Sequence, residues 1–193
     1  MAVGRRVALL CGLILSLGAG SATAKECAGV NFPDQVQVDG STLTLNGLGM
    51  RKATLLKLDV YVAALYVATA TRDPAVILDS KTPTRLVLHF VRAVGAGDIS
   101  NGFDEGFARS AKDQLPALRD RIAMLDNWMV DIQTGQQMTF TSRPGTGVLV
   151  DVNGAAKGTI RGDDFARAFL SIWLGANPPN VEIKRGLLGG ACT

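Results

Sequence analysis

The chain has few of the residue types that build metal centres and nucleophilic triads. Its 193 residues include one histidine and three cysteines. One histidine excludes a metal site built on several imidazoles, and a Ser-His-Asp triad would have to use that residue, His89. His89 alternates with Leu86, Leu88 and Phe90 in a strand-like segment, which favours a structural role over acid–base catalysis. We therefore predict no metal and no cofactor.

Long apolar runs are missing after the N-terminus, where no stretch approaches the ~20 apolar residues of a transmembrane helix. The N-terminus itself has two arginines, an apolar run over residues 7–17, and Ala22-Thr23-Ala24. This is the plan of a secretory signal, and its apolar run is too short to span a bilayer. The alternative, an N-terminal core helix, does not explain the Ala-x-Ala site at the expected spacing. We predict that residues 1–24 are a cleaved signal peptide.

The predicted mature chain, residues 25–193, has 193 − 24 = 169 residues, which is a usual length for one domain. Strong net charge is also missing. Cleavage removes Arg5 and Arg6 and lowers the net charge from +3 to 3 − 2 = +1. That value argues against nucleic acid and against a charge-driven membrane partner. We expect a periplasmic or secreted, soluble domain without an integral membrane segment, and the sequence leaves its oligomeric state open.

Two cysteines remain once Cys11 leaves with the signal. Cys27 and Cys192 lie near the two ends of an exported chain, which predicts a disulfide that ties the termini together. The alternative is a zinc or catalytic thiol site, which requires nearby histidine or acidic partners.

Strand patterns dominate the first half of the chain. Residues 57–67 and 85–92 are rich in Val, Leu and aromatic residues, which indicates buried strands. Asp39-Gly40 and Asn153-Gly154 stand between alternating segments, the strongest short hairpin signal.

Three amphipathic helices are predicted among and after the strands. Asp98 is a candidate cap for the first, the second starts near Pro116, and Asp163 or Asp164 can cap the third, which stops at Gly175. The acidic pairs 104–105 and 163–164 are interpreted as first helical turns, and Trp128 and Trp173 as core residues. A short fourth helix is expected over 181–188. This order predicts an α+β fold, with an antiparallel sheet packed against a layer of helices.

The segment from Asn46 to Val67 carries the most informative polar residues. If it runs as one strand, Arg51 and Tyr61 are an even number of residues apart and share a face. A guanidinium and a phenol on one face of an apolar sheet can receive a carboxylate. The alternative is that Arg51 and Lys57 are solvated or pair with Asp59.

This segment resembles the bacterial branch of the chalcone isomerase-like family. The resemblance rests on Gly47-x-Gly49-x-Arg51, on Val60-Tyr61-Val-Ala-Ala-Leu-Tyr66, and on later segments around residues 86–90, 101–107, 169–178 and 184–189. It implies an antiparallel sheet under a helical layer, with a cleft between them. Plant members cyclise chalcones, whereas other members bind fatty acids without known catalysis.

The resemblance also implies roles for residues. Where plant enzymes place a Thr, a Tyr and an Asn, this chain has residues near Leu56, Ile99 and Gly106, and so lacks groups that hold the substrate ketone. In fatty-acid-binding members an Arg and a Tyr hold the carboxylate, and Arg51 and Tyr61 match both. The first hypothesis is therefore a non-catalytic protein that binds a fatty acid or similar apolar carboxylate through Arg51 and Tyr61. The alternatives are a chalcone isomerase-type intramolecular lyase and an interaction module with a vestigial cleft.

Overall fold

The computed structural model describes residues 24–53 and 58–193, so the predicted signal peptide, apart from Ala24, lies outside the described residues. One antiparallel sheet contains seven of the described strands in sequential order, and β1 and β2 form a separate hairpin. The strands are β1 (Ala24–Cys27), β2 (Val30–Pro33), β3 (Gln35–Val38), β4 (Ser41–Ala53), β5 (Leu58–Val67), β6 (Thr84–Phe90), β7 (Gln137–Arg143), β8 (Gly147–Val152) and β9 (Ala155–Arg161).

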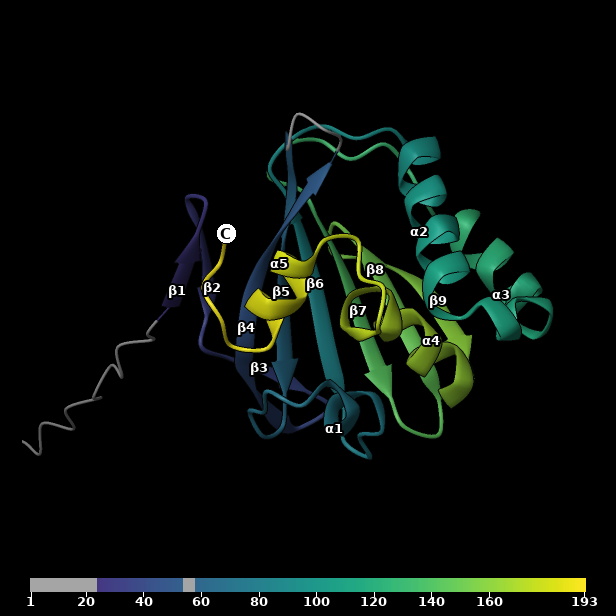
Figure 1. The fold of residues 1–193 in the computed structure, drawn as a ribbon, viewed down its shortest axis with the longest axis horizontal. Coiled ribbons are helices and arrows are strands. Elements are labelled where there is room, and N and C mark those ends of the chain that lie inside the picture. The colour runs from purple at the N-terminus through teal and green to yellow at the C-terminus, as the bar shows by residue number, and fades with distance from the viewer. Residues whose placement is uncertain (1–23, 54–57) are drawn as a thin grey trace, which may run out of the picture.

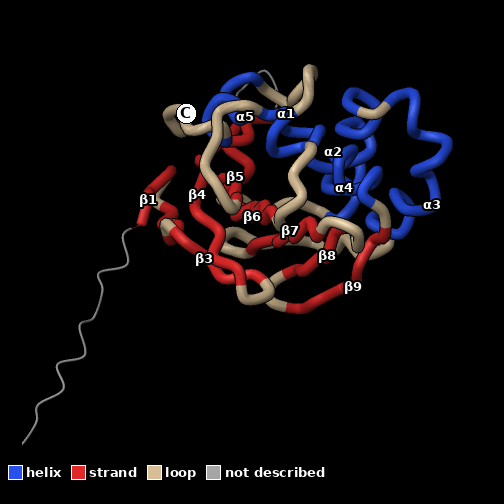
Figure 2. Tube along the Cα trace, turned by 90° about the horizontal axis from the view of Figure 1, so that it is seen from below, coloured by secondary structure: helices blue, strands red, loops and turns tan. Residues whose placement is uncertain are grey.

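The α-helices lie on one side of this sheet. Figure 2 shows the strands as a curved arc with the helices gathered on its inner side. The helices are α1 (Pro74–Leu78), α2 (Ala96–Ser110), α3 (Leu115–Asp126), α4 (Asp163–Leu174) and α5 (Val181–Leu187). The predicted α+β architecture is confirmed. In the described part of the chain, no helix has both the length and the apolar character that crossing a membrane requires.

Both predicted hairpin turns are present. Asp39 and Gly40 have φ of 50° and 78°, and Asn153 and Gly154 have φ of 57° and 80°. Two successive positive φ values are what a type I′ turn requires, and this turn matches the twist of the strands it joins. The Asp39 carboxylate also pairs with the Arg143 guanidinium, at 2.6 Å between Oδ2 and Nε. That ion pair links the turn between β3 and β4 to the end of β7.

The sheet separates two apolar clusters. Leu86, Leu88 and Phe90 of β6 point into the larger cluster under the helices. The alternate residues face the smaller cluster, which includes Phe32 of β2. His89 lies on this second face, where its ring meets Phe32 edge-on at 6.2 Å between centroids, and burial lowers the pKa of its imidazole. This apolar environment fits the structural role predicted for His89.

The helix starts differ from the sequence predictions in detail. The caps of α2 and α4 are Gly95 and Gly162, each one residue before its helix begins. Asp98 was wrongly predicted as a cap, because the side chain of Asp131 accepts the Ala96 N–H at 2.9 Å and supplies that bond instead. The pair 163–164 does lie in a first turn, but 104–105 lies well inside α2, so that interpretation was wrong. Pro116 and Gly175 stand at the predicted start and stop of their helices.

The termini are joined as predicted. Cys27 of β1 and Cys192 form a disulfide, with Cα atoms 6.0 Å apart and a sequence separation of 165. Figure 1 shows the C-terminal segment turning back from α5 to lie beside the β1–β2 hairpin. The disulfide therefore anchors both the hairpin and the segment that follows α5.

The contact between α2 and α3 contains an acid whose ionisation opposes folding. Burial, and the nearby charge of Asp104, raise the pKa of Asp126 to about 6. A folded-state pKa above the unfolded one means that the folded chain binds this proton more tightly. The protonated Asp126 carboxyl therefore contributes to the stability of the fold below the unfolded pKa of about 3.9. This contribution is lost as pH rises through about 6.

We expect Asp126→Asn to raise the melting temperature at neutral pH and to have little effect at pH about 4. The measurement is thermal unfolding of both proteins across this range, compared as their difference at each pH. If the difference in melting temperature between the two proteins were the same at every pH, the raised pKa of Asp126 would be contradicted.

Candidate functional site

The segment from Asn46 to Val67 is a hairpin rather than one strand. It contains the end of β4 and all of β5, and Arg51 is directly opposite Tyr61 in their register. Cross-strand partners put their side chains on the same face. The predicted proximity of Arg51 and Tyr61 is therefore present, but it comes from strand pairing and not from even spacing. Lys57 lies outside the described residues, and Asp59 pairs with Lys52 at 4.0 Å.

The Gly-x-Gly motif before Arg51 lets α5 lie directly on β4. A Cβ atom at Gly47 would overlap the carbonyl oxygen of Gly186, and one at Gly49 would overlap that of Ile183. These two glycines and Arg51 alternate along the strand and therefore share the face under α5. Beyond α5 that face is open, and Arg51 extends there into a cavity.

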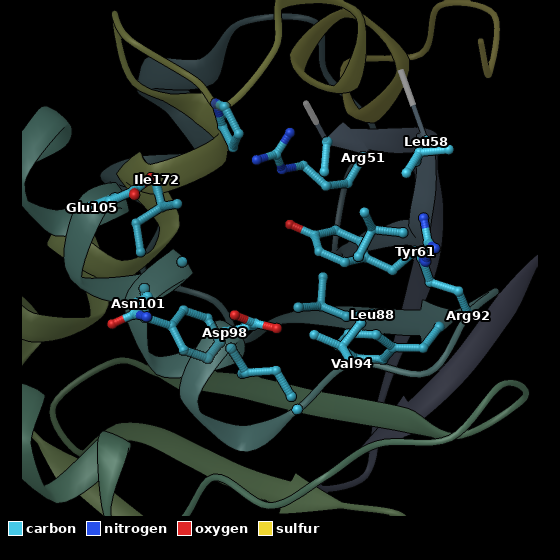
Figure 3. Close-up of a pocket in the computed structure, with 18 of the residues that line it drawn as sticks. Arg51, Leu58, Tyr61, Leu88, Arg92, Val94, Asp98, Asn101, Glu105 and Ile172 are labelled. Atoms are coloured by element: carbon cyan, nitrogen blue, oxygen red, sulfur yellow. The ribbon is translucent and has the colours of Figure 1, made fainter. Parts of the chain in front are cut away.

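The cavity has a volume of about 660 Å³ and lies between the sheet and helices α2 and α4. Its apolar wall includes Leu88 and Phe90 of β6, Ile99 and Phe103 of α2, and Ile172 of α4. Figure 3 shows the Arg51 guanidinium and the Tyr61 hydroxyl both directed into the space toward the wall that carries Ile172 and Glu105. The arrangement is a pocket with an apolar wall and convergent polar groups, which is typical of small-molecule sites.

Tyr61 is held in place by a second aromatic residue. The indole N–H of Trp173 donates to the Tyr61 hydroxyl oxygen at 2.9 Å, and Phe90 meets the phenol ring edge-on at 5.5 Å. Burial raises the pKa of Tyr61, so the phenol is protonated at neutral pH. Because an indole is only a donor, the phenol oxygen accepts and its own proton is free to donate to a ligand. Trp173 is buried as predicted, but it also lines the cavity.

Arg51 keeps most of its hydrogen-bonding capacity for a ligand. Its guanidinium donates to the carbonyl oxygen of Lys52. No carboxylate among residues 24–53 and 58–193 forms an ion pair with it. A guanidinium has five N–H donors, so several remain for a carboxylate.

The polar side of the cavity was not predicted from the sequence. This side is lined from α2 by Asp98, Asn101, Glu105 and Arg109, and by Arg92 in the segment that follows β6. Their spacing of three, four and four residues puts the α2 group on one helical face, beside the stripe of Ile99 and Phe103. This spacing of polar residues is visible in the sequence and could have indicated the polar side of the cavity. No cluster of three or more His, Cys, Asp or Glu suited to a metal occurs in the described part of the chain.

The positions matched to plant chalcone isomerases provide no donors where the structure describes them. Ile99 lines the cavity with an apolar side chain, and Gly106 packs closely against Ile172. Leu56 lies outside the described residues.

Comparison with known proteins agrees with this architecture. A sequence model of a family described as chalcone isomerase-like matches residues 24–189. No curated protein sequence matches the chain significantly. Among solved structures, the fatty-acid binding protein AtFAP1 of Arabidopsis thaliana has a TM-score of 0.69 and 18% identity. The match covers 86% of this chain and 96% of that one. At this identity the likeness shows the shared fold.

Proposed function

The chain belongs to the chalcone isomerase-like family, and from this premise we propose that it binds a fatty acid or similar apolar carboxylate without catalysing its conversion. We further propose that it does so after export to the periplasm or beyond the cell. The disulfide supports export, because disulfides persist mainly in oxidising compartments.

The observation that carries the proposal is the pairing of Arg51 with Tyr61 on neighbouring strands, in a cavity that has an apolar wall. The guanidinium would form a charge-assisted, bidentate contact with the carboxylate. The Tyr61 proton, left free by the bond from Trp173, would add a second donor. The ligand's apolar chain would lie against Leu88 and the aromatic residues of the cavity.

The cavity and the structural comparison support this occupant. A volume of about 660 Å³ falls within the ~300–1,000 Å³ usual for ligand pockets. The similar structure from Arabidopsis thaliana is that of a protein named for fatty-acid binding. A chalcone isomerase would need donors for the substrate ketone, but Ile99 has an apolar side chain and Gly106 has none. A chalcone cyclisation assay, followed by loss of absorbance, tests that alternative directly.

Lipid extraction and mass spectrometry of the purified protein test the proposal, beside Arg51→Ala. We expect a stoichiometric fatty acid in the wild type and none in the variant. Added laurate should bind to the variant about tenfold to thirtyfold more weakly, the value of a lost charge-assisted contact. Arg119→Ala is the matched control, because Arg119 is exposed on α3 outside the cavity.

Either of two results would contradict the proposal. A wild-type protein that is empty, and that stays empty when offered octanoate, laurate or palmitate, does not bind this class of ligand. Equal binding by wild type and Arg51→Ala would place the carboxylate elsewhere.

A further inference from the structure

A second guanidinium lines the cavity, and it comes from the helical layer. Arg109 belongs to α2, whereas Arg51 belongs to β4, and both line the cavity. Both positive charges act on the Tyr61 phenol: burial raises its pKa, and Arg51 and Arg109 each lower it by a smaller amount. The Tyr61 hydroxyl therefore lies in the field of two arginines.

A single carboxylate does not need both. One bidentate guanidinium and one phenol proton give each of its two oxygens a hydrogen bond, and Arg51 and Tyr61 already provide these donors. A second arginine becomes useful when the head group has a second negative charge or a third acceptor oxygen. A phosphate monoester has both features, and so do two carboxylates on one carbon.

Arg109 is available for such a contact. Its partner is Glu105, at 3.4 Å in an i, i+4 pair, and the side chains are 37% and 71% exposed. An exposed pair of this kind shifts an equilibrium by at most about fivefold, so a ligand can displace it easily. Glu105 also lines the cavity, and its negative charge opposes the binding of an anion.

We propose that Arg109 is the second cation of the head-group end, and that the occupant is an apolar chain with a dianionic head group, a phosphate monoester or a geminal dicarboxylate. This inference rests on the proposed function, because it uses the same cavity and the same contacts of Arg51 and Tyr61. It makes Arg109 a specificity-determining residue and Glu105 a residue that opposes binding.

The test is the affinity of the full chain for three probes of equal chain length: laurate, dodecyl phosphate and dodecylmalonate. At pH about 7.5 the phosphate monoester is mostly dianionic, because its second pKa is near 6. We expect one or both dianions to bind at least about tenfold more tightly than laurate in the wild type. Which dianion binds more tightly distinguishes a phosphate ligand from a dicarboxylate ligand.

Variants then assign the preference to its residues. Arg109→Gln should weaken dianion binding by about tenfold and laurate binding much less, while Arg109→Lys should keep most of the preference. Glu105→Gln should strengthen dianion binding by a few-fold. Arg119→Gln, an exposed arginine on α3, removes the same charge outside the cavity and is the control. Thermal unfolding of each variant confirms that it is folded.

Three other outcomes would contradict part or all of these proposals. Laurate binding as tightly as both dianions overturns this inference and leaves the proposed function standing. A dianion preference that survives Arg109→Gln overturns the role of Arg109. A protein that binds none of the three probes contradicts the proposed function, and this inference with it.

Discussion

Replacing both cysteines of the disulfide, Cys27→Ala with Cys192→Ala, is expected to lower the free energy of unfolding by about 4 kcal/mol. The bond closes a loop with a sequence separation of 165 residues. In the chain-entropy model, a closed loop longer than about 100 residues removes close to 5 kcal/mol of conformational freedom from the unfolded chain. Measured losses are usually somewhat smaller than this value. Urea unfolding of the oxidised wild type and of the double variant measures the difference.

Reduction provides the matched control. A thiol reductant should lower the stability of the wild type to that of the double variant and should leave the double variant unchanged. Local effects should appear first at the β1–β2 hairpin, because Cys27 and Phe32 are its buried links to the smaller cluster. Hydrogen exchange of that hairpin should therefore quicken. A change below about 1 kcal/mol would show that the disulfide does not constrain the unfolded chain as expected.

Features that depend on local chemistry, on the number of cysteines or on the period of apolar residues could be predicted from the sequence. Asn153-Gly154 specifies its turn because the conformation needs two positive φ values, which these residues tolerate. The bond between Cys27 and Cys192 could be predicted because these are the two cysteines that remain once the predicted cleavage removes Cys11. The alternating apolar residues of β6 predicted a strand because their period fixes which side is buried.

Features that depend on tertiary pairing could not be predicted in this way. Arg51 and Tyr61 were expected together for the wrong reason, because the sequence does not show that β4 and β5 pair in antiparallel. The bond from Trp173 to Tyr61 joins residues 112 positions apart. The polar stripe of α2 is typical of an ordinary solvated helix face, and only the position of α2 over β6 turns it toward a cavity.

The structural basis of the Gly-x-Gly motif also became visible only in three dimensions. Its glycines do not occupy turns and have no positive φ, so backbone conformation does not require them. What requires them is the contact of α5 with β4, where Gly186 of α5 would overlap the Leu48 carbonyl oxygen if it had a Cβ atom. Glycines on both elements allow the two backbones to touch. The same contact sets the position of α5 on the strand that carries Arg51.

Gly47→Ala is accordingly expected to lower the free energy of unfolding by about 3 kcal/mol, at the upper end of the cost of overpacking. The new methyl group would meet the Gly186 carbonyl oxygen and would lie 2.8 Å from both the Gly189 nitrogen and the Leu187 carbonyl oxygen. All three are backbone atoms, so no side-chain rotation relieves the overlap and α5 must move. That movement would also break the bond from the Asn46 side-chain amide to the Leu187 carbonyl oxygen, 2.7 Å long.

Gly97→Ala is the matched control for this substitution. Gly97 lies in the first turn of α2, and a Cβ atom there would meet nothing within 4 Å. Alanine in an open helical position should stabilise the protein by about 0.5–1 kcal/mol, because it restricts the unfolded chain more than glycine does. The two substitutions add the same methyl group, so their opposite signs would isolate the α5–β4 contact as the cause. Unfolding curves that show Gly47→Ala to be as stable as the wild type would mean that α5 does not lie on β4 as described.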